Sequence, residues 1–303
     1  MQIGMIGLGK MGANMTRRLL QGGHAAVVFD LSPKNIEALA AEGALPTSSL
    51  EYLVGKLAPP RTVWIMLPAG KPVDDTINSL KALLSKDDVI IEGGNSFYKD
   101  SLRQEAFVKE AGIGFLDAGV SSGIWGLQKG YCLMIGGEKD LFDRLTPIFE
   151  TLAPKDGFMH CGPAGAGHFI KMVHNGIEYA LMAAYGEGFE LVKKSPYGDI
   201  DFERLASLWN HGSIIQSWLL EFAEMAFKKH GDLSDIEGYV VDSGEGRWTV
   251  QQAVDFAVHA PLISGALFQR FRSREKECFA DRLLAALRDE FGGHGFKKSD
   301  SST

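Results

Sequence analysis

Cysteine is scarce in this chain, and long apolar runs are missing. The 303 residues include three cysteines, Cys132, Cys161 and Cys278, which lie far apart and never in the Cys-x-x-Cys spacing typical of zinc or redox sites. We therefore expect three reduced thiols, buried or inert, and a cytoplasmic protein. No apolar stretch reaches the roughly 20 residues of a membrane-spanning helix, and the first residues, MQIGMIGLG, carry no charged leader. We expect neither export nor membrane anchoring.

Positive charge is also limited. The 31 Lys and Arg residues against 38 Asp and Glu residues leave a net charge of −7, and no basic run is long enough to indicate nucleic-acid binding. The histidines show no His-x-x-x-His pattern with a matching carboxylate, so no metal site is expected. Hydrophobic residues at 45% and charged residues at 23% are the proportions of a globular protein. We expect a compact protein with a small-molecule ligand.

Short apolar runs alternate with amphipathic stretches over residues 1–162. The runs are IGMIG, AAVVFD, TVWIML, DVIIEGG, IGFLDAG, CLMIGG and DGFMH. Strands that alternate with helices in this way indicate a parallel sheet covered by helices on both faces. We therefore predict an α/β N-terminal domain over residues 1–162, with a Rossmann-like, doubly wound fold that binds a nucleotide.

The pattern becomes purely helical over residues 163–303. The stretch AGHFIKMVHNGIEYALMAAYGEGFELVKK keeps helical periodicity for roughly eight turns. Later stretches that also read as helices are FERLASLWNHG, SWLLEFAEMAFKKH, TVQQAVDFAVHA, PLISGALFQRFRSR and FADRLLAALRDEF. We predict a second, all-α C-terminal domain, ending in a polar, disordered tail.

Gly7, Gly9 and Gly12 form a Gly-x-Gly-x-x-Gly motif directly after the first predicted strand and at the start of a helix. The first glycine makes a tight turn, the second lets the backbone approach a pyrophosphate, and the third lets the helix pack on the strand. Asp30, 18 residues after Gly12, ends the second strand, where a carboxylate can bind a ribose 2′-hydroxyl and would repel a 2′-phosphate. Asp30 therefore favours NAD over NADP as the cofactor. The alternative is that Asp30 only caps the turn DLSP.

A second polar feature lies on the long predicted helix. Lys171, His174, Asn175 and Glu178 occur at i, i+3, i+4 and i+7, a spacing that places all four on one helix face. One interpretation is a solvated surface. The other is a functional site, because no deep apolar stripe separates these residues and several glycines precede them.

Two predicted strands end in polar residues, at the sheet edge where doubly wound folds bind ligands. One strand is followed by Asn95 and Ser96, and the other by Ser121, Ser122 and Gly123. Both segments could also be ordinary turns. Their position on the same edge as the glycine motif favours a functional role.

The segments GLGKMGANM, IIEGGNSFYKD, DAGVSSGIWG, GPAGAGHFIKMVHNGIEYALMAAYGEG and DSGEGRWT together resemble the 6-phosphogluconate dehydrogenase family, in its short, NAD-leaning bacterial form. The resemblance runs in order along nearly the whole chain. It implies oxidative decarboxylation of 6-phospho-D-gluconate to D-ribulose 5-phosphate and carbon dioxide, with NAD as cofactor and NADP less favoured. It also implies that the helical domain binds this phosphorylated sugar acid and forms a homo-oligomer, a dimer or a tetramer.

The resemblance implies a role for each candidate residue. Lys171 matches the family's catalytic lysine, which takes the proton of the C3 hydroxyl, and Glu178 matches the acid that protonates C2 after carbon dioxide leaves. The matched substrate-binding positions are Asn95, Ser121, Gly123, His174, Asn175, Tyr179, Arg270, Arg288 and His294. The matched cofactor-binding positions are Gly7, Leu8, Gly9, Lys10, Met11, Gly12, Asp30, Leu67, Pro68 and Asn95. The last two substrate residues, in LRDEFGGH, would reach the site of a neighbouring subunit.

Some positions depart from the family pattern. Ser122 stands where the family usually has glycine. The phosphate-binding lysine that precedes the family's Gly-Lys-Trp-Thr block is missing from DSGEGRWT, and Arg247 is a candidate replacement. Arg272 competes with Arg270 for the 6-phosphate.

Two other functions remain as alternatives. A 3-hydroxyacid dehydrogenase of the 3-hydroxyisobutyrate type would share the nucleotide loop and the lysine, but not Glu178 or the GRWT segment. A nucleotide-binding regulatory module would need neither Lys171 nor Glu178, because it performs no proton transfer.

Overall fold

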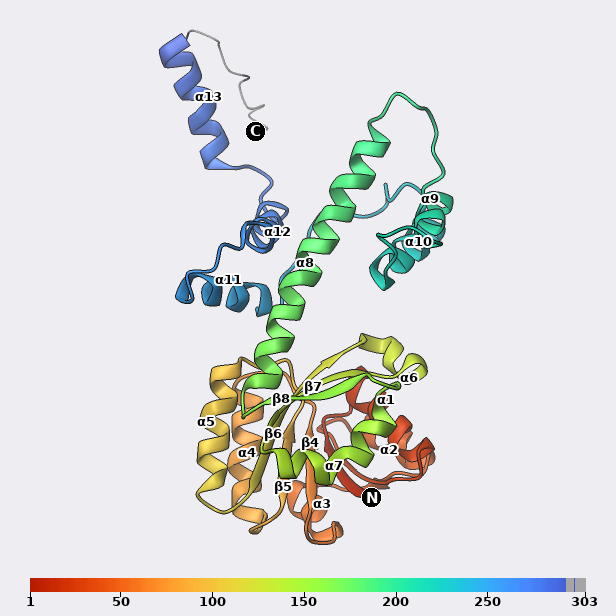
Figure 1. Cartoon of the computed structure of the whole chain (residues 1–303), viewed down its shortest axis with the longest axis vertical. Coiled ribbons are helices and arrows are strands. Elements are labelled where there is room, and N and C mark those ends of the chain that lie inside the picture. Colours follow the sequence, from red (N-terminus) through yellow and green to blue (C-terminus); the bar gives the residue numbers. More distant parts are fainter. Residues whose placement is uncertain (293–296, 298–303) are drawn as a thin grey trace. The chain divides into compact units, whose positions relative to one another are not determined.

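The computed structural model describes residues 1–292 and residue 297. It contains two compact units, Met1–Gly176 and Ile177–Thr303 (Figure 1). The division falls inside the long helix α8 (Ala166–Lys193), whereas the change of sequence pattern predicts a boundary at residue 162. Helix α8 therefore contributes its first turns to the first unit and its remaining turns to the second.

An eight-stranded sheet forms the centre of the first unit, with strand order β3-β2-β1-β4-β5-β6-β7-β8. The strands are β1 (Gln2–Ile6), β2 (Ala25–Phe29), β3 (Leu45–Pro46), β4 (Thr62–Ile65), β5 (Val89–Glu92), β6 (Gly114–Ser121), β7 (Cys132–Gly137) and β8 (Phe158–Gly162). Each apolar run that predicts a strand forms one. The sequence does not predict β3, because two residues, one of them proline, make no periodic pattern.

One pair of strands departs from the predicted parallel sheet. β7 runs antiparallel to β6, with Ser121 opposite Cys132, while the other neighbouring pairs are parallel. The connection, residues 122–131, contains only the short helices η1 (Gly123–Trp125) and α6 (Gly126–Lys129). A parallel crossover needs about a dozen or more residues, so this connection is too short for one.

Helices cover both faces of the sheet, as predicted (Figure 1). One face packs on α1 (Lys10–Gln21), α2 (Pro33–Ala41) and α7 (Lys139–Leu152), and the other on α3 (Leu50–Lys56), α4 (Lys71–Leu83) and α5 (Tyr98–Lys109). Successive strand residues alternate between two cores: Val89 and Ile91 enter the first, and Ile90 enters the second. Both faces are therefore buried, which explains why the strands read as continuous apolar runs.

The second unit is helical, as predicted. After the remainder of α8 it contains α9 (Phe202–Trp209), α10 (Trp218–His230), α11 (Glu245–Asp255), α12 (Pro261–Arg272) and α13 (Phe279–Gly292), and the described part of this unit has no strand. Phe189, Leu220 and Phe227 centre one small core, and Tyr179 and Leu267 centre another. The tail predicted to be disordered lies almost entirely outside the described residues.

The cysteines are free, as expected, but they are not all buried. Within the described chain all three are free, but Cys132 is exposed, and Cys161 and Cys278 are half-buried. Cys132 is the first residue of β7, so it lies at the end of that strand and not in the core of the unit. Across residues 1–292 and 297, no helix is both long and apolar enough to span a membrane, and no three His, Cys, Asp or Glu side chains are grouped as metal ligands.

Candidate active site

The glycine motif joins the carboxyl end of β1 to α1. Gly7 has a φ of 90°, a left-handed conformation that glycine adopts without strain. A Cβ at Gly12 would strike the carbonyl oxygen of Gly7, so the missing side chain lets α1 pack closely on the strand. Gly9 caps α1, whose first residues are Lys10 and Met11, and nothing lies within 4 Å of where a Cβ of Gly9 would be. The helix N-terminus is thus open to an anion such as a pyrophosphate.

Asp30 follows β2 and joins two loops. Its Oδ2 accepts a hydrogen bond from the backbone N–H of Leu8 (2.5 Å). Its Oδ1 accepts from the N–H of Ser32 (2.7 Å) and from Nδ2 of Asn35 (3.3 Å). Asp30 therefore caps the turn after it and also fixes the glycine loop. A carboxylate can accept about four hydrogen bonds, so capacity remains for a ribose hydroxyl.

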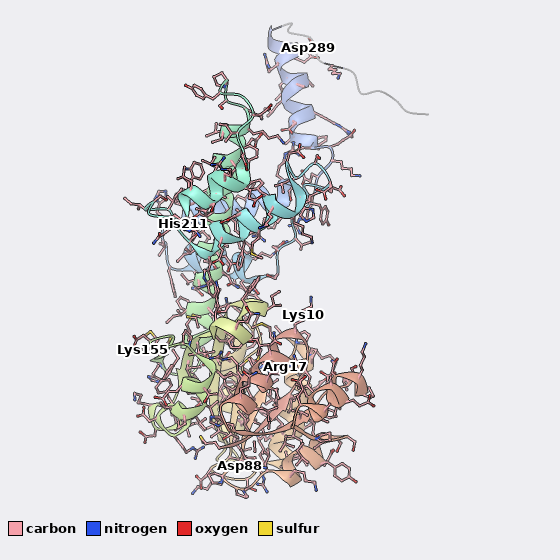
Figure 2. All side chains as sticks on the ribbon, turned by 90° about the vertical axis from the view of Figure 1, so that its right-hand side faces the viewer. Lys10, Arg17, Asp88, Lys155, His211 and Asp289 are labelled. Carbon is pink, nitrogen blue, oxygen red and sulfur yellow. The ribbon has the colours of Figure 1, made fainter. Side chains whose placement is uncertain are left out.

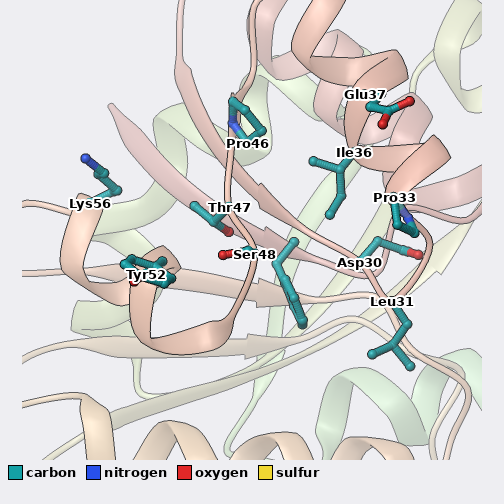
Figure 3. Close-up of a pocket in the computed structure, with 11 residues that line it drawn as sticks. Asp30, Leu31, Pro33, Ile36, Glu37, Pro46, Thr47, Ser48, Tyr52 and Lys56 are labelled. Atoms are coloured by element: carbon teal, nitrogen blue, oxygen red, sulfur yellow. The ribbon is translucent and has the colours of Figure 1, made fainter.

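A cavity of about 630 Å³ opens beside Asp30 (Figure 3). Its lining includes the apolar side chains of Leu31, Pro33 and Ile36, with Tyr52 from α3. Apolar walls with a polar group at one edge are typical of a site for a flat base joined to a sugar.

The β4–α4 loop lies against the glycine motif. A Cβ at Gly7 would lie 2.8 Å from Cδ2 of Leu67, and Pro68 is the next residue of the same loop. Asn95 is exposed in the β5–α5 loop. All of these residues follow the carboxyl ends of neighbouring strands, close to β1, where the strand order reverses. Doubly wound folds bind their ligands at this point.

Lys171 and Asn175 are buried in the first turns of α8. Each is 8% exposed, so this helix face is not a solvated surface. Nζ of Lys171 lies 3.4 Å from Nδ1 of His174, and Nε2 of His174 lies 3.3 Å from Oγ of Ser121. Nδ1 of His174 is also 3.2 Å from Oδ1 of Asn175. The structure thus brings four predicted site residues together at the carboxyl end of β6.

Ser122 and Gly123 continue from this group. Gly123 is exposed at the start of η1. Ser122 has a φ of 109°, a backbone conformation that residues other than glycine rarely adopt. This backbone conformation explains why glycine is usual at the position.

Tyr179 and Arg270 come together in the second unit. The guanidinium carbon of Arg270 lies 3.4 Å from the centroid of the Tyr179 ring, a cation–π contact. Arg270 also donates to the carbonyl oxygen of Val241 (2.9 Å). Arg272, the rival residue, instead donates to Asp281 of α13 (2.6 Å).

Two residues without a predicted role, Ser243 and Glu245, extend the contacts of Tyr179. Oγ of Ser243 lies 3.4 Å from the Tyr179 hydroxyl and donates to Oε2 of Glu245 (2.5 Å). Glu245 is 1% exposed. The available signal was their place in the DSGEGRWT segment, where polar residues alternate with glycines.

Asp242, from the same segment, holds two arginines. Its carboxylate accepts from Arg247 (2.5 Å) and from Arg274 (2.8 Å). The hydrogen bond from Arg247, helped by that from Arg274, keeps the pKa of Asp242 below its usual range. Arg247 is therefore held by Asp242, a few residues along the chain from Ser243 and Glu245, and the two arginines share one negative charge.

The remaining predicted residues lie along α8 and α13. Glu178 is seven residues after Lys171 on α8, and it borders a largely apolar cavity of about 890 Å³ in the second unit. Arg288 is exposed on α13. His294 lies outside the described residues.

Family models match both parts of the chain. Residues 2–162 match the NAD binding domain of 6-phosphogluconate dehydrogenase, and residues 167–281 match its C-terminal domain. An NAD(+)-dependent, decarboxylating 6-phosphogluconate dehydrogenase of Haloferax volcanii is 45% identical over 99% of this chain and 100% of its own length.

Solved structures share the fold. The 6-phosphogluconate dehydrogenase of Plasmodium falciparum matches with a TM-score of 0.83 and 28% identity, over 100% of this chain and 67% of that one. A 3-hydroxyisobutyrate dehydrogenase of Mycobacterium tuberculosis matches with a TM-score of 0.72 and 24% identity, over 95% of this chain and 99% of that one. The family models and the identity to the Haloferax protein decide between the two: the chain belongs to the 6-phosphogluconate dehydrogenase family.

Proposed function

We propose that the protein oxidises and decarboxylates 6-phospho-D-gluconate to D-ribulose 5-phosphate and carbon dioxide, with reduction of NAD. The observation that carries this proposal is the buried Lys171, which contacts half-buried His174, which in turn contacts half-buried Ser121 at the carboxyl end of β6, in the sheet whose β1 leads into the glycine motif. A buried amine surrounded by polar groups suits proton transfer to and from a bound sugar acid.

The residues of the first unit fit NAD. Gly9 leaves the N-terminus of α1 open to a pyrophosphate, Asp30 keeps acceptor capacity for a ribose hydroxyl, and the adjacent cavity has apolar walls for a base. When bound, NAD accepts a hydride from C3 of the substrate. We propose a preference over NADP, because the Asp30 carboxylate would repel a 2′-phosphate and the Haloferax relative is named as NAD(+)-dependent.

Lys171 and Glu178 would divide the proton transfers. Lys171, in its neutral form, takes the proton of the C3 hydroxyl as C3 is oxidised. As a cation it then donates to the C3 carbonyl oxygen, and this stabilises the charge left when the bond to the carboxylate breaks and carbon dioxide departs. Glu178, as an acid, delivers a proton to C2 of the resulting enediol.

The other matched residues would orient the sugar acid. Arg270 is the proposed ligand of the 6-phosphate with Tyr179, because a guanidinium group pairs its N–H donors with phosphate oxygens and Arg272 is already bound to Asp281. Arg247 is a second candidate. The proposed contacts to the remainder of the substrate are Asn95, Ser121, Gly123, His174 and Asn175.

A second copy of the chain is the proposed partner. Helix α13 carries exposed apolar side chains on one face: Phe279, Leu283, Leu284 and Leu287. Exposed apolar stripes of this kind mark interaction surfaces. In a homo-oligomer the partner chain would bury this stripe and receive Arg288, and also His294, in its own substrate site.

An assay with purified protein tests the proposal. With 6-phosphogluconate we expect NADH and carbon dioxide in equal amounts, and slower turnover with NADP. Lys171→Met should abolish turnover while NAD still binds, because the base is lost and the nucleotide site is not. A nearly normal rate in this variant would remove Lys171 from the mechanism. Turnover of 3-hydroxyisobutyrate in place of 6-phosphogluconate would favour the alternative function.

A further inference from the structure

Three buried ionisable side chains lie close together in the first unit, and the chemistry proposed above uses none of them. Glu92 ends β5, Asp117 lies in β6, and His168 lies in the first turn of α8. They are 0%, 0% and 1% exposed. The candidate site residues of β5, β6 and α8 follow them by three or four residues along the chain. Burial of ionisable groups is costly, so their place beneath a site calls for a function.

Asp117 binds the start of α8. Its Oδ1 accepts a hydrogen bond from the backbone N–H of Gly165 (2.6 Å), and its Oδ2 accepts from that of His168 (2.8 Å). The first N–H groups of a helix have no partner within the helix. A carboxylate that satisfies two of them also interacts favourably with the helix dipole. Asp117 therefore fastens the first turn of α8 to β6.

The side chain of His168 extends these contacts to two other elements. Its Nδ1 lies 2.7 Å from Oγ of Ser101 in α5 and 3.6 Å from Oε2 of Glu92. The other oxygen of Glu92 accepts from the N–H of Gly94 (2.7 Å), next to Asn95. The loop that carries Asn95 and the helix that carries the lysine are thus joined through one buried group.

The first turns of α8 rest directly on the sheet. A Cβ at Gly119 of β6 would lie 2.5 Å from Cβ of Lys171 and 2.8 Å from the carbonyl oxygen of Gly167. With so little space between helix and strand, the way the first turn of α8 is held determines where Lys171 lies.

We infer that Asp117 and His168 are positioning residues for the reaction, which hold the first turn of α8 on β6 and α5 and so place Lys171 beside Ser121. The inference rests on the role proposed for Lys171. For a change at Asp117 it predicts a loss of turnover without a loss of nucleotide binding, because the hydrogen bonds of Asp117 go to the start of α8 and not to the glycine motif, Asp30 or the loop of Asn95.

Asp117→Asn is the sharpest test. The variant keeps the shape of the side chain but turns one oxygen into an NH2 group, which faces the N–H of Gly165 or of His168 and cannot accept from it. We expect kcat to fall about 10- to 100-fold, the effect of a small misplacement of a catalytic group. The dissociation constant for NAD should stay unchanged.

Asp88→Asn is the control, at a buried aspartate that also forms an ion pair with the side chain of Arg61 (3.0 Å). Asp88 is 0% exposed and likewise accepts from two backbone N–H groups, those of Arg61 (2.6 Å) and Ser85 (2.9 Å). It lies at the opposite end of the first unit from Lys10, which opens α1 (Figure 2). We expect this variant to lose stability while it keeps its kcat, measured at a temperature where both variants are folded.

Several results would overturn the inference. A similar fall of kcat in both variants, or weaker NAD binding in step with kcat in Asp117→Asn, would indicate general loosening of the fold. A normal kcat in Asp117→Asn would show that Asp117 does not position Lys171. If that variant does not fold, Ser101→Ala, which removes the hydroxyl group beside His168, must lower kcat instead. An active Lys171→Met would refute the role of the lysine, and it is measured independently of these variants.

Discussion

Ser122 has a backbone conformation that serine tolerates poorly. Its φ of 109° lies where only glycine is free of steric strain. We expect Ser122→Gly to raise the free energy of unfolding by about 1 kcal/mol, the lower end of the cost of such strain. Urea unfolding would measure this, with Ser122→Ala as the control, since alanine keeps the Cβ. A glycine variant no more stable than the alanine variant would contradict the expectation.

Glu92 predicts a dependence of stability on pH. Burial raises the pKa of its carboxyl group above the ordinary 4.5, although nearby His168 acts in the opposite direction. The unfolded chain therefore releases this proton at a lower pH than the folded chain does. The stability that the group contributes is complete below about pH 4.5 and is lost as the pH rises through the folded pKa.

Glu92→Gln should remove this dependence. Glutamine mimics the protonated acid and can still accept the N–H of Gly94. We expect the variant to match the wild type near about pH 4, below the ordinary pKa, and to exceed its stability near about pH 8, by about 1.4 kcal/mol for each unit of pKa shift crossed. Urea unfolding at both pH values tests this. A difference between the two proteins that stays constant with pH would refute a raised pKa.

At the scale of single residues, the sequence predicts local motifs but not contacts between distant segments. The spacing of Gly12 and Asp30 after β1 predicts where they lie, because a short loop and one strand determine it. Ser243 was not singled out, since its contact joins it to Tyr179, 64 residues away in the sequence. A single sequence does not show which segments that are far apart along the chain come together in the folded protein.

Among the elements, helices were predicted more completely than the sheet. The periodicity of α8 extends over 28 residues and depends only on local spacing. The direction of β7 depends instead on whether residues 122–131 can cross the sheet, which an apolar run does not reveal. The sequence does not predict β3 for a related reason: with two residues it is too short to form a periodic pattern.

Helix α13 provides a prediction about assembly. Leu284 is 60% exposed within the apolar stripe, and an aspartate there would place a charge in the proposed subunit contact. We expect Leu284→Asp to lower the molar mass measured by light scattering toward that of one chain, and to lower kcat with it.

Leu208→Asp in α9 is the control for this variant, because Leu208 is 65% exposed and undergoes the same change. It should leave the mass unchanged. An oligomer that survives Leu284→Asp, or one that Leu208→Asp disrupts equally, would count against α13 as the contact.

At the scale of the whole molecule, shared sites predict complementation. If Arg288 acts in the partner's site, Lys171→Met and Arg288→Ala homodimers should both be nearly inactive. A mixed dimer has one site with an intact lysine and an intact arginine from the other chain. Equal mixtures that are unfolded and refolded together should therefore recover about a quarter of the wild-type activity, by random pairing.

The control is to mix the two variants without refolding, which should recover no activity while the dimers stay intact. Equal mixtures that remain inactive after refolding, although light scattering shows dimers, would place Arg288 in the site of its own chain or outside any site.

Helix α8 has a consequence for how this fold can be divided or recombined. The helix passes without a break from one compact unit into the other, and Lys171 and Glu178 fall on opposite sides of the division after Gly176. A chimera spliced at that division would take its base from one parent and its acid from the other. Exchange between relatives that preserves the chemistry must therefore transfer α8 whole, with the junction placed before Ala166 or after Lys193.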